Sequence, residues 1–232
     1  MKTVHRLKTT VSRLAKLCGY RLERIVDYSD YQLDIFPVLI DRLNPTDPDF
    51  FFVQVGANDG KSGDPIHHLV RQYHWKGLLL EPQPQVFQRL CENYRDETQL
   101  ILENAALSHE DSTQSFYTVD GSSYLGSFDR NALVKRVRDV SKIIEVSVQA
   151  VTYPGLVSRH RIDRVDLLQV DTEGFDYQVI KMTVGEHLPY PRLIRYEHLH
   201  LSTSDRAACA EYLASHHYKL MRDGRDTIAF RD

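Results

Sequence analysis

Two glycines and a glutamate have the spacing of a nucleotide-binding turn. Gly56 and Gly60 follow the apolar run of residues 50–55, where glycine lets backbone N–H groups approach a ligand at the end of a strand. Glu81 comes about twenty residues further on, where a carboxylate can accept hydrogen bonds from both ribose hydroxyls. An ordinary tight turn and a solvated carboxylate explain each feature alone. Together they predict an adenosine-type ligand.

The turn departs from the dinucleotide-binding motif. That motif requires G-x-G-x-x-G, and counting from Gly56 puts Asn58 and Lys61 at its second and third glycine positions. A nicotinamide cofactor is therefore not expected, which disfavours an oxidoreductase.

The elements that would position this turn alternate between strands and helices. Residues 50–55 are typical of a strand buried on both faces, and Asp64 and Pro65 indicate the start of a helix over residues 65–74. Further strands are predicted at 77–80, 100–102, 165–171, 193–201, 219–222 and 227–230, and helices at 84–94, after Gly174 and at 205–216. This order predicts right-handed βαβ units and a doubly wound, mostly parallel α/β sheet.

A region of different character interrupts this order at about residues 109–151. Residues 114–119 and 143–151 alternate like antiparallel strands, around a Gly/Ser-rich stretch and a short basic helix. We expect a β-hairpin insertion that roofs the ligand, with Ser122, Ser123 and Tyr124 shaping an acceptor pocket. A surface hairpin without ligand contacts is the alternative.

Composition favours a single soluble domain with little affinity for nucleic acid. The 232 residues are 42% hydrophobic and 26% charged, and the net charge of -3 gives no overall attraction to nucleic acid. No apolar run approaches the roughly 18 residues of a membrane span, and the N-terminus lacks the apolar centre of a signal peptide. We expect a cytoplasmic protein without a nucleic-acid partner.

The N-terminal residues have a pattern of their own. Residues 1–26 place apolar side chains near helical spacing with basic side chains between them, which predicts a basic amphipathic helix. We expect an N-terminal helical segment at 1–44 and a catalytic domain at 45–232. The basic face could make peripheral contact with an anionic membrane or an acidic partner. Packing on its own domain is the alternative.

Five motifs in order along the chain are similar to those of the FkbM family of S-adenosylmethionine-dependent methyltransferases. They are Val-Gln-Val-Gly-Ala-Asn-Asp-Gly at 53–60, Gly-Asp-Pro at 63–65, Leu-Glu-Pro at 80–82, Asn-Ala-Ala-Leu-Ser at 104–108 and Asp-Leu-Leu-Gln-Val-Asp-Thr-Glu-Gly at 166–174. The resemblance covers roughly residues 50–200. It implies a class I methyltransferase (Rossmann-like) fold with an antiparallel last strand, and O-methylation of a hydroxyl on a sugar, glycan or natural product.

The resemblance also implies which residues hold S-adenosyl-L-methionine. The implied cofactor-binding residues are Gln54, Gly56, Ala57, Asn58, Asp59, Gly60, Asp64, Glu81, Glu103, Asn104, Ala105 and Asp171. The glycine turn would line the methionine and ribose, Glu81 would hold the ribose hydroxyls, and residues 103–105 would lie beside the adenine. Family members often carry Lys-Ile-Asp-Val-Glu-Gly where this chain has Gln-Val-Asp-Thr-Glu-Gly at 169–174, so both carboxylates remain.

Methyl transfer to a hydroxyl needs a group that takes up the proton of the acceptor. Asp171 and Glu173 follow the strand at 165–171, and Glu197 and His198 fall on the strand at 193–201, so these four are the catalytic candidates. On a strand, Glu197 and His198 point to opposite faces. Asp171 could instead bind the cofactor amine, Glu173 could cap the next helix, and His198 could be structural.

A divalent metal is possible but not required by the pattern. Asp171, Glu173 and Glu197 could together bind Mg²⁺, which prefers carboxylate oxygens. No compact ligand motif is present. The alternative to an enzyme is a non-catalytic nucleotide-binding module that regulates or scaffolds a partner.

Overall fold

The computed structural model describes residues 35–121 and 125–231. The chain from Ile35 to Asp232 forms one compact unit. The helix predicted at 1–26 and the pocket residues predicted at 122–124 lie outside the described residues. Helix α2 (Ile35–Arg42) buries Phe36, Leu39 and Ile40 in the core. The compact unit therefore begins ahead of residue 45, where the sequence suggested a boundary.

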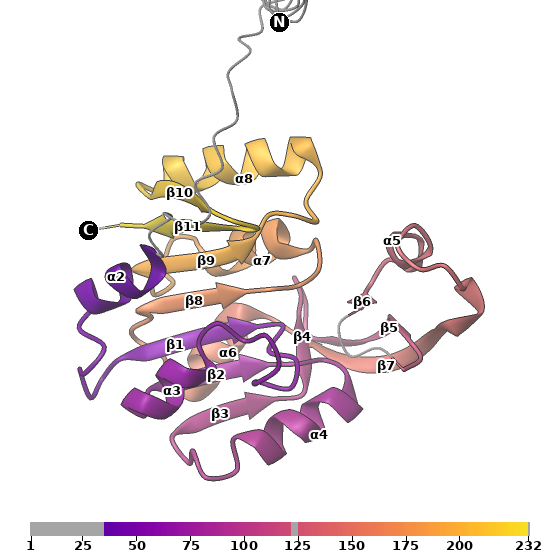
Figure 1. Ribbon diagram of the computed structural model, residues 1–232, viewed down its shortest axis with the longest axis horizontal. Coiled ribbons are helices and arrows are strands. Elements are labelled where there is room, and N and C mark those ends of the chain that lie inside the picture. Colours follow the sequence, from indigo (N-terminus) through magenta and orange to yellow (C-terminus); the bar gives the residue numbers. More distant parts are fainter. Residues whose placement is uncertain (1–34, 122–124, 232) are drawn as a thin grey trace, which may run out of the picture. The chain divides into compact units, whose positions relative to one another are not determined.

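A seven-stranded sheet forms the centre of this unit (Figure 1). Its order is β10 (Lys219–Asp223), β11 (Asp226–Phe230), β9 (Leu193–Glu197), β8 (Leu167–Val170), β1 (Phe51–Val55), β2 (Lys76–Leu80) and β3 (Leu100–Glu103). The strands from β9 to β3 are parallel, whereas β11 is antiparallel to both of its neighbours. The predicted doubly wound sheet with an antiparallel last strand is confirmed.

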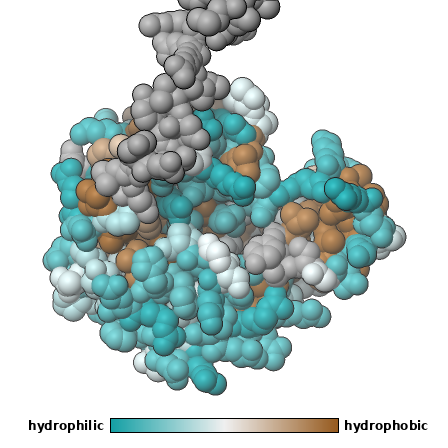
Figure 2. All heavy atoms as spheres, in the orientation of Figure 1, coloured by the Kyte–Doolittle hydropathy of each residue, from teal (hydrophilic) through white to brown (hydrophobic). Residues whose placement is uncertain are grey.

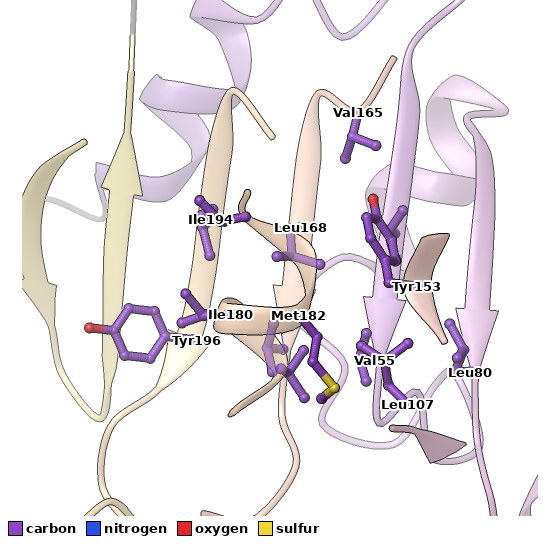
Figure 3. Packing of buried hydrophobic residues seen from close by; sticks show 14 of the residues in the cluster. Val55, Leu80, Leu107, Tyr153, Val165, Leu168, Ile180, Met182, Ile194 and Tyr196 are labelled. Carbon is purple, nitrogen blue, oxygen red and sulfur yellow. The ribbon is translucent and has the colours of Figure 1, made fainter. Parts of the chain in front are cut away.

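Helices cover both faces of the sheet, because the central strands are apolar on both sides. One face packs against α6 (Tyr153–His160), α7 (Asp176–Thr183) and α8 (Thr203–Ser215), and Figure 3 shows part of this core around Leu168 and Ile180. The other face packs against α2, α3 (His67–Tyr73) and α4 (Pro84–Asn93). These two layers fix the carboxyl ends of the parallel strands at one edge.

Two of the boundaries that differ from the sequence prediction have a visible cause in hydrogen bonding. Helix α3 begins at His67, because the Asp64 carboxylate accepts the N–H of Ile66 in a turn that precedes the helix. Strand β9 ends at Glu197, because the chain then turns and the N–H of Leu201 donates to the His198 carbonyl at 3.3 Å. The chain therefore turns four residues earlier than the apolar pattern through 201 suggested.

A second sheet of four strands contains the insertion. Its order is β4 (Ala105–Leu107), β7 (Ile143–Val151), β5 (Ser112–Val119) and β6 (Gly126–Ser127), with α5 (Arg130–Val134) and the 3-10 helix η2 (Val140–Lys142). Strands β5 and β7 pair antiparallel along the whole of β5, which confirms the hairpin. We call β5, β6, α5, η2 and β7 the arm; in Figure 1 it extends beyond the carboxyl ends of the parallel strands.

Helix length and composition bear on membrane insertion. In the described parts of the chain, no helix combines the length and the apolar character needed to cross a membrane.

Candidate active site

A cavity of about 880 Å³ lies where the parallel strands end. Its walls come from the loops that follow β1, β2 and β8, from β4, and from the arm. The sequence-predicted residues that line it are Gly56, Asn58, Glu81, Ala105, Asp171 and Glu173. The fold thus brings together side chains from three separate strand ends.

The loop after β1 is wedged between β2 and β8. The N–H groups of Gly56 and Ala57 donate to the Leu80 carbonyl at 3.1 and 2.9 Å. Gly56 has φ +80°, and a Cβ there would lie 2.0 Å from the carbonyl oxygen of Asp171. Only glycine fits, so the backbone of this loop lies directly against the start of the β8 loop.

We expect Gly56→Ala to destabilise the protein by roughly 2–5 kcal/mol, from the left-handed backbone and the overlap together. Chemical denaturation would measure the loss. Gly63→Ala is the matched control, since Gly63 has φ +72° but open space around its Cβ position. Equal losses in the two variants would show that the close approach to Asp171 is unimportant.

Glu81 is a buried carboxylate directed at the same loop. It is 4% exposed, and its two oxygens accept the N–H groups of Asn58 and Gln83, both at 2.9 Å. Burial raises its pKa to about 7, against the lowering effect of these two bonds. Because a carboxylate oxygen accepts more than one hydrogen bond, each can also receive a ribose hydroxyl.

Asn104 supports this arrangement from β3–β4. Its amide nitrogen donates to the carbonyls of Glu81 and Pro82, at 2.8 and 3.1 Å. Glu103 instead faces α6, where it accepts from His160 at 2.7 Å and Arg159 at 3.5 Å. Of the three residues expected beside adenine, Ala105 lines the cavity, Asn104 positions its wall and Glu103 pairs outside it.

The remaining predicted cofactor residues do not line the cavity. Gln54 bonds to Asp64 at 3.2 Å on the α3 side of the sheet, and Ala57 is buried in the core there. Gly60 packs against Leu90 and Tyr94. These residues build the loop without contacting the cavity.

Asp59 stabilises the same loop through hydrogen bonds to its backbone. Its carboxylate accepts the N–H groups of Lys61 and Ser62 at 2.9 and 2.7 Å. Residues 60–62 read Gly-Lys-Ser, but Val55 stands where a P-loop has its first glycine. Because these N–H groups already have a partner, the loop is not a P-loop phosphate cradle.

Carboxylates gather at the end of β8. Burial raises the pKa of Asp171 to about 8, and the charges of Asp176 and Glu197 add to the shift. Asp176 is fully buried, and burial raises its pKa to about 6 against hydrogen bonds from Thr172 and Gly174. It also accepts the N–H of Glu197 at 3.2 Å and thereby ties the start of α7 to the end of β9.

Glu173 joins the arm to this cluster. The backbone of Glu173 has φ +57°, a conformation that is uncommon for residues other than glycine. Arg136 of the arm donates to the Glu173 carbonyl at 2.9 Å and forms an ion pair with its carboxylate. A strained residue held from two sides is typical of a functional position.

His200 lines the cavity and lies against two glutamates. Its Nε2 is 3.4 Å from Oε2 of Glu173 and 3.6 Å from Oε2 of Glu197. Burial and then the charge of Glu173 raise the pKa of Glu197 to about 7, whereas burial and the charge of Arg136 lower the pKa of His200. Glu197 therefore titrates near neutral pH, and the lowered pKa of His200 favours its neutral imidazole, which can accept a proton.

His198, a predicted catalytic residue, lies elsewhere. It borders a separate cavity of about 280 Å³ with Tyr196 and Arg206, and its Nδ1 is 3.1 Å from the Thr227 hydroxyl. Burial, followed by the charge of Arg222, lowers its pKa. Because the chain turns after β9, His200 rather than His198 reaches the main cavity, which corrects the sequence expectation.

Three of these groups could hold a divalent cation. One ligand atom each from Glu173, Glu197 and His200 lies within 4.8 Å of the others, and Asp171 is not in the group. Arg136, however, is already paired with the same Glu173 oxygen that faces His200. A guanidinium thus supplies positive charge at this position.

Two phenylalanines of the arm and one of the loop after β8 form an aromatic wall that sequence reasoning missed. Phe116, Phe128 and Phe175 line the cavity, with ring centroids 5.3 Å apart for the first pair and 6.1 Å for the second. Figure 2 shows apolar surface on the arm in brown, beside hydrophilic surface in teal. The sequence predicted that the arm roofs the site, but the alternation of residues gave no basis for choosing these rings.

The strand order, the reversed last strand and the cavity at the carboxyl ends together define a class I methyltransferase fold. Residues 54–223 match the family described as the methyltransferase FkbM domain, and the chain belongs to this family. The resemblance found in the sequence motifs is therefore confirmed, and with it methyl transfer from S-adenosyl-L-methionine as the family's chemistry. No curated protein matches the chain.

Solved structures that are similar to this chain are distant methyltransferases. Fibrillarin from Aeropyrum pernix, with natively bound S-adenosyl-L-methionine, is 10% identical with a TM-score of 0.44, covering 80% of this chain and 67% of that one. Precorrin-6y C5,15-methyltransferase from Geobacter metallireducens GS-15 is 11% identical with a TM-score of 0.45, covering 87% and 92%. The METTL16 MTase domain is 10% identical with a TM-score of 0.47, covering 94% and 75%.

Proposed function

We propose that this protein is an S-adenosylmethionine-dependent O-methyltransferase that acts on a hydroxyl of a sugar, glycan or natural product. The observation that supports it best is that one cavity is lined by the Gly56 loop and Glu81 and also by Glu173 and His200, with Glu197 beside His200. The Gly56 loop and Glu81 suit a nucleoside cofactor. His200 and the glutamates beside it suit removal of a hydroxyl proton.

The residues present fit S-adenosyl-L-methionine. Glu81 would hold the ribose hydroxyls, the backbone of Gly56 and Asn58 would lie along the ribose and methionine, and Ala105 would contact the adenine. Asp171 would receive the cofactor amine, for which a nearby carboxylate is the natural partner. When bound, the cofactor supplies an electrophilic methyl group on a sulfonium.

His200 is the proposed proton acceptor. The imidazole would take the proton of the acceptor hydroxyl, and Glu197 and Glu173 would stabilise the imidazolium that results. Arg136 would hold Glu173 in place from the arm. The role first assigned to His198 passes to His200, because only His200 lines the cavity.

The alternative is a non-catalytic nucleotide-binding module that uses residues 1–26 to regulate or scaffold a partner. The cluster around His200 favours the enzyme, since binding alone requires no proton acceptor. A cytoplasmic location and membrane contact through residues 1–26 also remain proposals.

Calorimetry with S-adenosyl-L-methionine, followed by a methyl-release assay over a panel of hydroxyl acceptors, tests the proposal. We expect cofactor binding and turnover of at least one sugar or natural product. Cofactor binding without any methylated acceptor would favour the regulatory module. Absence of cofactor binding would refute both.

Removal of divalent cations provides a further prediction. We expect turnover to be unchanged, within about twofold, after dialysis against a chelator, because the guanidinium of Arg136 already neutralises Glu173. Inductively coupled plasma mass spectrometry would verify that metal is absent. A loss of activity that Mg²⁺ restores would instead assign Glu173, Glu197 and His200 as metal ligands.

A further inference from the structure

Residues 125–143 of the arm carry positive charge in a chain that is acidic overall. Residues 125–143 contain five basic side chains and two aspartates, whereas the whole chain has a net charge of -3. The basic residues are Arg130, Lys135, Arg136, Arg138 and Lys142. A local excess of one sign beside a cavity raises the local concentration of ligands with the opposite sign.

Three of these cations have no carboxylate partner within the described residues. Arg136 is paired with Glu173, and the pKa of Asp139 is lowered by hydrogen bonds from Ser141 and then by the nearby charge of Lys142. The other three, Arg130, Lys135 and Arg138, make no ion pair with any carboxylate in the described parts of the chain. Lys135 lines the cavity itself.

Lys135 is fixed in position by helix α5. Helix α5 ends at Val134, and Lys135 is the residue that caps it. The N–H of Lys135 donates to the Asn131 carbonyl. Asp129 begins the helix by accepting the N–H of Asn131 at 2.9 Å, so its charge is used within the turn. The backbone of Lys135 is thus held at the edge of the cavity by a capped helix.

The same wall contains Phe116 and Phe128, which contact each other edge to face. An apolar ring face next to an ammonium suits a sugar ring that carries an acidic substituent. A nucleic acid suits it less, because its phosphates would have to pass Asp171, Glu173 and Asp205, which line the same cavity. One anionic group directed at the arm avoids that repulsion.

We propose that the acceptor is an acidic glycan, whose carboxylate is bound by Lys135 while Arg130 and Arg138 attract it to the arm. The proposal rests on the proposed function for the presence of an acceptor. It assigns the arm to the recognition of charge, while β1, β2 and β8 bind the cofactor.

Binding of the full chain to a glycan array, with S-adenosylhomocysteine present, tests this without requiring turnover. The array pairs uronate-containing oligosaccharides with their carboxyl-reduced, neutral counterparts. We expect binding to acidic members, about 10- to 100-fold weaker binding to their reduced counterparts, and a similar loss in Lys135→Glu. Arg95→Glu is the matched control, since Arg95 is 79% exposed and does not line the cavity.

Several outcomes would overturn the inference. These are equal binding of acidic and reduced members, no binding to any glycan, unchanged binding by Lys135→Glu, or tighter binding to a single-stranded RNA probe. Calorimetry on the same sample reports cofactor binding separately. A failure of the inference is therefore distinguishable from a failure of the proposed methyltransferase activity.

Discussion

Glu81→Ala should weaken binding of S-adenosyl-L-methionine by about 100-fold or more. The carboxylate would make two charge-assisted hydrogen bonds to the ribose, each worth about 1.5–3 kcal/mol. Its removal also leaves the N–H groups of Asn58 and Gln83 without their acceptor, which loosens the loop that faces the cofactor. Isothermal titration calorimetry would measure the change in Kd.

Glu103→Gln is the informative companion to this variant. Glu103 was also expected to contact the cofactor, but its carboxylate pairs with His160 and Arg159 of α6. We expect its Kd to stay within about threefold of the wild-type value, since a neutral amide removes no contact in the cavity. Equal losses in the two variants would mean that Glu81 has no special role. Circular dichroism melting would show that both proteins are folded.

His200→Ala should lower kcat by about 10²- to 10⁴-fold, the usual contribution of a positioned acid or base. The Kd of the cofactor should change little, because His200 would act on the acceptor. His198→Ala is the matched control: it removes the same side chain two positions earlier, from the separate cavity, and should retain near-normal kcat. The reverse result would restore His198 as the base.

The pH dependence gives a second measure of the same site. Glu197 has a pKa raised to about 7, so it is protonated below that pH and ionised above it. Only the ionised form stabilises an imidazolium on His200. We therefore expect kcat to rise as the pH increases through about 7 and then to level. In Glu197→Gln this rise should disappear and kcat should be low throughout; an unchanged profile would exclude Glu197.

The cofactor side of the site could be predicted from sequence because its signals are local. Gly56 and Glu81 each end an apolar strand, and parallel strands bring their carboxyl ends to one edge. Asp171 and Glu173 were found by the same reasoning at β8. The parallel arrangement of the central strands followed from the alternation of strands and helices, and the antiparallel last strand was expected from the family resemblance.

The acceptor side depended on contacts that no local pattern reveals. Arg136 and Glu173 are 37 residues apart and meet only because the arm extends beyond the sheet. His200 was missed because the apolar residues through 201 hid the turn after Glu197. The spacing of three residues between Glu197 and His200 was the available signal, since such a spacing in a turn brings two side chains to one side.

The arm leaves and re-enters the domain at neighbouring points. Strand β4 pairs with β7 from Ala105↔Gln149 to Leu107↔Val151, and the N–H of Ser108 donates to the Val151 carbonyl at 2.8 Å. Because the two junctions are already side by side, an arm of different length could replace this one with little change in loop-closure entropy. The arm is therefore suited to exchange between homologous enzymes, which would evolve new acceptors by recombination while the cofactor half is inherited intact.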